Sequence, residues 1–180
     1  MVLLKGETPA PPTAADVLMA ASPAAAAVVS VGERLSLMPA TPGLAETNLA
    51  LVNELGRERR LRTALEVLAD DFDACIVDTP PTKSLLSVNA LNAIDDAIVP
   101  VAPGLFSLAG LGQLQATLDE VRRFLDNRRL RLAGIVLTLA ERTGVARDVE
   151  AQVRAAFGGL VFRTVIHRAV KVEEAHSRFQ

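Results

Sequence analysis

The residue whose position most clearly suggests chemistry is an aspartate at the end of an apolar run. Residues 74–77 show no alternation of polar and apolar side chains, which is typical of a strand covered on both faces. Asp78 follows this run directly, and two prolines after Thr79 prevent further strand pairing. A carboxylate there can hold hydrated Mg²⁺ against nucleotide phosphates, because this ion takes one or two carboxylates and keeps its waters. The alternative is an aspartate that only caps the turn into Thr79 and Pro80.

The elements around this aspartate alternate between apolar runs and helical periodicity. Apolar runs predict further strands at residues 97–101, 132–139 and 160–166. Apolar residues spaced by three and four predict helices at residues 83–94, 108–125 and 145–157. Buried strands that alternate with helices pair in parallel, so the expected fold class is a doubly wound, mostly parallel α/β sheet with flanking helices.

Ligands of such sheets bind beyond the carboxyl ends of the strands. This rule selects three places in the sequence: the segment from Asp78 to Pro80, the pair Ala102 and Pro103, and Thr138 with the loop to Arg142. The turn at His167 and Arg168, after the last strand, is an additional candidate.

The N-terminal part has a different composition. Residues 1–12 are rich in proline and small side chains, and we expect a flexible arm there, followed by a single domain over residues 13–180. Periodicity predicts helices at residues 14–21, 44–55 and 61–68, with arginines between the last two. Two short strands, residues 27–31 and 35–38, are expected to form a hairpin around Gly32 and Glu33.

Composition excludes several classes of function. Of the 180 residues, 50% are hydrophobic and 22% are charged, while aromatic residues make up 3% and include no Trp or Tyr. Binding of single-stranded nucleic acid by aromatic stacking is therefore not expected. The single cysteine, Cys75, rules out an internal disulfide and is expected in the core, and with His167 and His176 it makes a poor zinc set. We find no apolar stretch long enough for a membrane span and no signal sequence, and we expect a cytoplasmic protein.

Charge is distributed unevenly along the chain. Residues 1–120 carry a balance of −8 and residues 121–180 a balance of +6, which together give the net charge of −2. The basic end suggests contact with the phosphates of double-stranded DNA, and the alternative is a set of ordinary solvated helix faces. The candidate DNA-binding residues are Arg122, Arg123, Arg128, Arg129, Arg142 and Arg147.

Two stretches of the sequence resemble the ParA/Soj branch of the deviant-Walker ATPases, within the ParA/MinD superfamily. These are DFDACIVDTPPTKSLLSVNALNAIDDAIVPVAPGLFSLAGLGQL and GLVFRTVIHRAVKVEEAHSR, and the similarity runs from about Thr13 to the end. The resemblance implies a P-loop NTPase-like fold that binds ATP and Mg²⁺. It further implies dimerisation, non-specific DNA binding on the nucleoid, and a ParB-type partner protein.

The same resemblance assigns roles to individual residues. Asp78 is then the Walker B acid associated with Mg²⁺, and Thr79 with Pro80 forms a switch segment that senses the γ-phosphate. Thr138, His167 and Arg168 are similar to the residues at the adenine edge of the family's nucleotide site.

One motif of that family is missing from the sequence. A phosphate loop of the form GxxxxGK[ST] needs a Gly-Lys pair, and the chain contains none. The resemblance places this loop and the first strand before Met1 and the last helix after Gln180, so we expect a domain truncated at both ends that alone neither binds ATP tightly nor hydrolyses it. One alternative is a non-enzymatic remnant that binds a full-length relative or a ParB-type partner. Another is a MinD-like membrane-positioning ATPase, which would need an amphipathic C-terminal helix.

Overall fold

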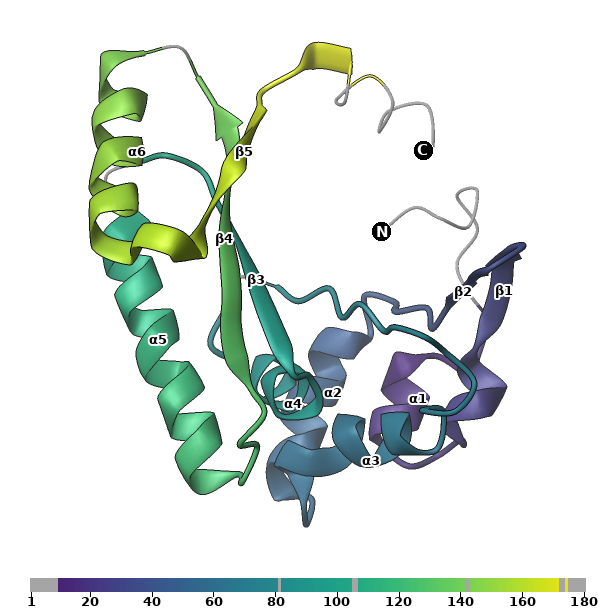
Figure 1. Ribbon diagram of the computed structural model, residues 1–180. Coiled ribbons are helices and arrows are strands. Elements are labelled where there is room, and N and C mark those ends of the chain that lie inside the picture. Colours follow the sequence, from purple (N-terminus) through teal and green to yellow (C-terminus); the bar gives the residue numbers. More distant parts are fainter. Residues whose placement is uncertain (1–9, 81, 105–106, 142, 172–173, 175–180) are drawn as a thin grey trace. The chain divides into compact units, whose positions relative to one another are not determined.

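The computed structural model describes residues 10–80, 82–104, 107–141, 143–171 and 174 (Figure 1). The chain divides into two compact units, which we call unit 1 (Met1–Ile94, with Arg178–Gln180) and unit 2 (Asp95–Ser177). The single domain expected over residues 13–180 stays a prediction. Most of the predicted arm, residues 1–9, lies outside the described residues.

Unit 2 contains a three-stranded parallel sheet. Its strands are β3 (Asp96–Val101), β4 (Arg131–Ala140) and β5 (Val161–His167), in the order β3-β4-β5, and both pairs are parallel. The helix α5 (Ser107–Phe124) connects β3 to β4. The helix α6 (Gly144–Phe157) and the short η4 (Gly158–Leu160) connect β4 to β5. Figure 1 shows α5 and α6 on the same side of this sheet. The predicted α/β class and the parallel pairing are confirmed.

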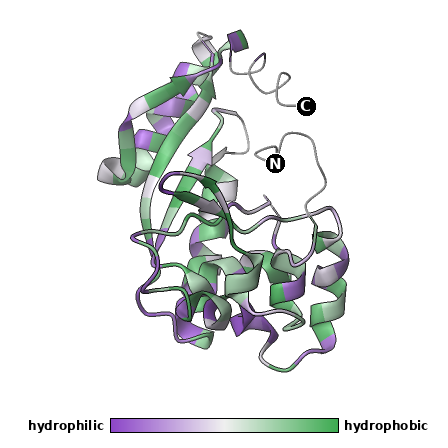
Figure 2. Ribbon diagram, turned by 90° about the vertical axis from the view of Figure 1, so that its right-hand side faces the viewer, coloured by the Kyte–Doolittle hydropathy of each residue, from purple (hydrophilic) through white to green (hydrophobic). Residues whose placement is uncertain are grey.

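The core of unit 2 follows from the register of these strands. Val99, Ile135 and Val161 form one row across the sheet, and Val101, Leu137 and Val165 form the next. Alternate residues of a strand point to the same face, so both rows meet the helices, where Leu111 of α5 and Val149 and Val153 of α6 pack against them. Ile135, Leu137 and Val153 are fully buried. Figure 2 shows these strands as mainly hydrophobic and α6 as mixed.

One glycine of β4 is required by a close approach. The ring of Phe162 on β5 lies against Gly134, at a distance that leaves no room for a Cβ atom. The ring thus packs on bare backbone, and any larger residue at position 134 would displace it.

Unit 1 consists of short helices and one hairpin. Its helices are α1 (Ala14–Leu18), η1 (Ala24–Ala27), α2 (Leu44–Ala50), η2 (Leu51–Asn53), η3 (Arg57–Arg59), α3 (Arg60–Glu66) and α4 (Leu85–Ala93). The strands β1 (Val29–Gly32) and β2 (Leu35–Leu37) pair antiparallel, which confirms the predicted hairpin. A small core of Val17, Ala24, Ala27 and Leu68 holds the N-terminal part of this unit. Each described helix of the chain is too short or too polar to cross a bilayer.

The strand predicted at residues 74–77 is wrong. This segment belongs to neither sheet, Cys75 is exposed rather than buried in a core, and Ile76 has 95% of its surface exposed. A strand needs a neighbour that takes up its backbone hydrogen bonds, and no described strand pairs with these residues. The apolar pattern alone therefore does not make these residues a strand.

Candidate functional site

The segment that carries Asp78 lies in unit 1 and leads into α4. Asp78, Thr79 and Pro80 are all exposed, and none of them belongs to a strand. The start of α4 is fixed by Ser84, whose hydroxyl accepts a 3.2 Å hydrogen bond from the Ser87 amide. The Ser87 hydroxyl in turn donates to the Thr82 carbonyl at 2.5 Å. A carboxylate and a hydroxyl therefore stand in solvent a few residues before a well-capped helix.

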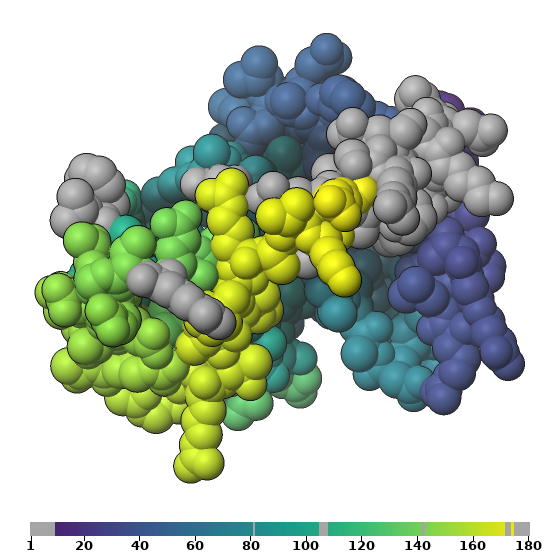
Figure 3. All heavy atoms as spheres, turned by 90° about the horizontal axis from the view of Figure 1, so that it is seen from above, coloured from purple at the N-terminus to yellow at the C-terminus, as the bar shows by residue number. Residues whose placement is uncertain are grey.

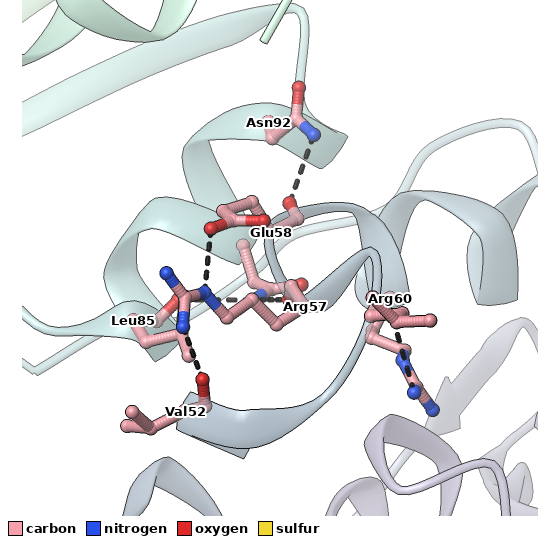
Figure 4. Close-up of polar contacts among 8 residues, drawn as sticks. Val52, Arg57, Glu58, Arg60, Leu85 and Asn92 are labelled. Carbon is pink, nitrogen blue, oxygen red and sulfur yellow. Dashed lines mark hydrogen bonds and ion pairs between the residues drawn. The ribbon is translucent and has the colours of Figure 1, made fainter.

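Two buried asparagines on α4 attach this helix to η3 and α3. Asn89 is 1% exposed; its side-chain oxygen accepts from the Leu61 amide at 3.1 Å, and its amide donates to the carbonyls of Arg57 at 2.6 Å and Leu85 at 3.0 Å. Three positions later, Asn92 donates to the Glu58 carbonyl at 2.9 Å (Figure 4). Since α3 has no cap from its own N-terminal side chain, Asn89 serves that role from another helix.

Ion pairs lie beside Asn89 and Asn92, which we call the asparagine clamp. Arg57 Nε lies 2.8 Å from Glu58 Oε1, and its guanidinium also donates to the Val52 carbonyl (Figure 4). The hydrogen bond from Arg57 lowers the pKa of Glu58. Arg60 reaches Glu54 at 2.7 Å. Sequence analysis did not find the clamp, although two asparagines three residues apart in an otherwise apolar helix were a signal for it.

Unit 2 contains a cavity of about 500 Å³ at the carboxyl edge of its sheet. Its apolar lining residues come from the segment after β3, the end of β4 and the start of α6: Ala102, Pro103, Leu139, Val145 and Ala146. Figure 3 looks down on this edge, where the green atoms of α6 and the yellow atoms that follow β5 lie close together. The place is the one at which ligands bind in parallel α/β sheets.

The polar lining residues of the cavity are Glu141, Thr143 and Arg168. Thr143 caps α6, and its hydroxyl accepts from the Ala146 amide at 3.2 Å. Arg168 Nη1 lies 3.5 Å from Glu141 Oε1, and the two side chains keep 59% and 55% of their surfaces exposed. The backbone amide of Arg168 donates to the Ala140 carbonyl at 3.3 Å, which holds the segment after β5 against the end of β4.

The residues predicted at the adenine edge do not all line this cavity. Arg168 lines the cavity, whereas Thr138 and His167 are not among its lining residues. The His167 ring instead lies 3.3 Å from the Ala140 carbonyl through Nδ1. The predicted ligand positions Ala102 and Pro103 do line the cavity, and Glu141 belongs to the predicted loop after Thr138. Asp78, Thr79 and Pro80 belong to unit 1, and all the cavity residues belong to unit 2.

The candidate DNA-binding arginines do not form one cluster. Arg122 and Arg123 are at the end of α5 with Arg128 and Arg129 just after it, whereas Arg147 is in the first turns of α6. The first group lies near the start of β4 and Arg147 follows its end, so about 30 Å of strand separates them. Arg142 lies outside the described residues.

These arginines also differ in their partners. Arg122 pairs with Asp119 at 2.7 Å and donates to the Leu130 carbonyl at 2.5 Å, and Arg128 pairs with Asp126 at 3.0 Å. The Arg123 guanidinium lies 5.2 Å from the centre of the Phe124 ring. Within the described part of the chain, Arg123, Arg129 and Arg147 make no ion pair, so these three remain available for phosphates.

The available metal-binding side chains decide how well the chain can bind a nucleotide together with a metal ion. Among the described residues, no group of three His, Cys, Asp or Glu side chains could hold a metal ion. Asp78 and Thr79 offer one carboxylate and one hydroxyl, which suits Mg²⁺ that keeps its waters and binds phosphates. The cavity of unit 2, whose lining combines apolar residues with a few polar groups, suits a purine base.

Comparison with known proteins places these features in a family. Residues 8–132 match the protein family described as "AAA domain". The chromosome-partitioning ATPase Soj of Thermus thermophilus is 45% identical over 142 residues, which cover 78% of this chain and 55% of that protein. The chromosome partitioning protein ParA of Myxococcus xanthus is 40% identical over 144 residues, 79% of this chain and 50% of that protein. The chain thus spans about half the length of the curated relatives it matches.

A solved structure shows the same fold. The cobyrinic acid a,c-diamide synthase from Mycobacterium smegmatis, with bound ATP analog and magnesium, superposes with a TM-score of 0.81 at 34% identity. The match covers 91% of this chain and 68% of that chain.

Proposed function

The chain belongs to the ParA/MinD superfamily, and on that premise we propose that it is part of a ParA/Soj-type partition ATPase whose ligands are ATP and Mg²⁺. The observation that carries this proposal is the cavity at the carboxyl ends of β3, β4 and β5. Parallel α/β sheets bind their ligands at this edge. A relative of known structure holds an ATP analog and magnesium, which supports the same ligand class here.

The proposal assigns candidate roles within each unit separately. In unit 2, the apolar lining residues of the cavity and Arg168 hold the adenine base, and Thr138 on β4 and His167 at the end of β5 are further candidates. In unit 1, Asp78 and Thr79 hold hydrated Mg²⁺, and Pro80 stiffens the segment that leads toward α4. When bound, Mg²⁺ would neutralise phosphate charge.

Turnover is not part of this proposal for the chain alone. The sequence contains no Gly-Lys pair, and the positively charged phosphate loop normally supplies much of the stabilisation for phosphoryl transfer. The chain by itself therefore binds nucleotide weakly and does not hydrolyse it.

Nucleotide titration with a matched pair of variants tests the nucleotide site. Arg168→Ala removes a cavity residue that follows β5, and Arg163→Ala removes an exposed arginine of β5 that does not line the cavity. We expect weak saturable binding of ATP with Mg²⁺, reduced about tenfold by Arg168→Ala and unchanged by Arg163→Ala. Equal affinities for all three proteins would contradict the site. Sustained phosphate release by the pure wild-type chain would contradict the claim that it is inactive alone.

The proposal also includes binding of double-stranded DNA by Arg123, Arg129 and Arg147, the candidate arginines that make no ion pair among the described residues. It further includes dimerisation around the nucleotide. Phosphate contacts give affinity without sequence preference and weaken steeply with salt. We expect Arg123→Gln with Arg129→Gln to weaken binding to random duplex DNA more than Arg122→Gln with Arg128→Gln, because the latter pair already has carboxylate partners. Duplex binding that does not depend on salt would overturn the electrostatic account.

A further inference from the structure

The end of β4 contains a residue in an unusual backbone conformation. Leu139 has a φ of 54°, in the left-handed region, although it is not a glycine. This conformation is unfavourable for a residue with a Cβ atom and is rare for a bulky side chain. It persists only where the surrounding contacts fix it, and such residues cluster at ligand sites. Since Leu139 lines the cavity of unit 2, the contacts that hold it bear on the proposed nucleotide site.

Two donors from the end of β5 converge on the next residue of β4, Ala140. Its carbonyl oxygen lies 3.3 Å from Nδ1 of the His167 ring, and it accepts a 3.3 Å hydrogen bond from the backbone amide of Arg168. A carbonyl oxygen has two lone pairs and can accept both bonds; because it cannot donate, Nδ1 carries the proton. Ala140 and His167 are also register partners in the pairing of β4 with β5. The ring and the amide therefore act on the same atom at the end of β4.

These contacts lie between residues that line the cavity. The residues before and after Ala140, which are Leu139 and Glu141, are both lining residues. Arg168, which follows His167, is a third, whereas Ala140 and His167 do not line the cavity. The ion pair of Glu141 with Arg168 spans 3.5 Å and is more than half exposed, so it is a weak restraint by itself. The bond from the His167 ring thus supplements the contacts that fix these lining residues relative to one another.

We propose that His167 is a positioning residue of the nucleotide site, whose ring holds the end of β4 in the left-handed conformation at Leu139. The inference rests on the proposed nucleotide site and gives His167 an indirect role there, through the Ala140 carbonyl. The hydrogen bond from Nδ1 carries this role, and the bulk of the ring does not. Because the side chain is exposed, water competes for the bond, and its loss weakens nucleotide binding only about threefold.

Two substitutions separate the hydrogen bond from the ring. His167→Phe keeps an aromatic ring without the donor, whereas His167→Asn removes the ring and supplies an amide N–H close to the position of Nδ1. Arg154→Met is the matched control, because Arg154 also donates to a backbone carbonyl of β5, that of Phe162 at 3.1 Å, but does not line the cavity. ATP with Mg²⁺ is titrated into each full chain while the backbone amide NMR signals of Glu141 and Arg168 are followed. Hydrogen exchange of the Arg168 amide without nucleotide is the second readout.

We expect His167→Phe to bind ATP with Mg²⁺ about threefold more weakly than the wild type, His167→Asn to regain most of this affinity, and Arg154→Met to lose none. The Arg168 amide should exchange about threefold faster in His167→Phe than in the other proteins, because the strand end opens more often.

Equal affinities of the wild type and His167→Phe would overturn the inference and leave the proposed nucleotide site intact. Equal exchange of the Arg168 amide in these two proteins would also overturn it, because the ring would then hold nothing. A loss of affinity that His167→Asn or Arg154→Met shares in full would count against it in the same way, since ring packing or general stability would be its cause. If ATP with Mg²⁺ shifts no signal of the wild type, both the inference and the proposed nucleotide site are wrong.

Discussion

Units 1 and 2 are stabilised by different kinds of contact. In unit 2, rows of branched aliphatic side chains across three strands meet two helices, and Ile135, Leu137 and Val153 are completely buried. In unit 1, a small apolar core holds the N-terminal part, and α4 is joined to η3 and α3 by two asparagine side chains, each 1% exposed, that bond to backbone groups. The comparison shows that one chain can hold a sheet by apolar burial and a helix cluster by a few directional hydrogen bonds.

The two kinds of contact respond differently to mutation. Removing carbon atoms from a buried aliphatic residue leaves a cavity, so the loss of stability increases with the volume removed. Removing a buried amide leaves its backbone partners unsatisfied, so the loss depends on the number of hydrogen bonds. The following variants separate the two cases.

The largest effect is expected in the core of unit 2. Ile135→Ala should lower the free energy of unfolding by about 3 kcal/mol, because a fully buried side chain is replaced by a cavity. Urea denaturation followed by far-ultraviolet circular dichroism measures this change, since the chain lacks Trp and Tyr as fluorescent probes. Ile98→Ala, whose side chain is 58% exposed on the neighbouring strand, is the control and should cost less than about 1 kcal/mol. If both variants lose the same free energy of unfolding, Ile135 is not the buried core residue that the structure describes.

The second effect concerns the asparagine clamp of unit 1. Asn89→Leu keeps the approximate volume and removes three hydrogen bonds, which should cost about 2 kcal/mol through unsatisfied backbone groups. Asn53→Leu, at an exposed position of η2, is the control. The same denaturation experiment applies. An Asn89→Leu protein as stable as the wild type would mean that apolar packing, not the amide, holds α4 to α3.

A smaller effect is expected at the helix caps, where the two units use the same device. Thr143→Ala in unit 2 and Ser84→Ala in unit 1 should each cost about 1 kcal/mol, because each side chain accepts a hydrogen bond from an amide three residues later. Thr143→Ser keeps the hydroxyl and should be close to neutral. Thermal unfolding of the four proteins measures these differences, and a neutral Thr143→Ala would contradict the cap of α6.

The smallest effect is electrostatic. Arg131 on β4 bonds to Asp96 on β3 and lowers the pKa of Asp96, as Arg57 lowers the pKa of Glu58 in unit 1. A lowered pKa in the folded state contributes stability above the ordinary pKa of about 3.9, and this contribution disappears as the pH falls through the lowered value. Carboxyl NMR titration should show the pKa of Asp96 returning to its ordinary value in Arg131→Met. If the pKa is the same in both proteins, the ion pair does not form in solution.

Two apolar runs show how far the sequence predicts this fold. Residues 97–101 and 74–77 have the same pattern, yet the first segment lies in β3 and the second belongs to no described strand and is mostly exposed. Periodicity reports what a segment can bury, whereas strand formation also needs a neighbour that is specified elsewhere in the chain. The parallel pairs of unit 2 were predictable because alternating apolar runs and helices specify such neighbours.

The candidate site was predictable in position but not in composition. Topology selected the carboxyl edge, including Ala102, Pro103 and Arg168, before any coordinates were considered. The pairing of Glu141 with Arg168 links residues 27 positions apart, and local patterns carry no information about such contacts. For the same reason, the sequence could not separate arginines with carboxylate partners from those without.

The central claim is that the cavity of unit 2 is the nucleotide site, and mapping of bound nucleotide on the intact chain tests it most directly. Titration of ATP with Mg²⁺ into isotope-labelled protein, followed through backbone amides, should give saturable shifts at the end of β4, the start of α6 and Arg168. Shifts confined to the other end of the sheet, around Arg123 and Arg129, or no shifts at millimolar nucleotide, would contradict it.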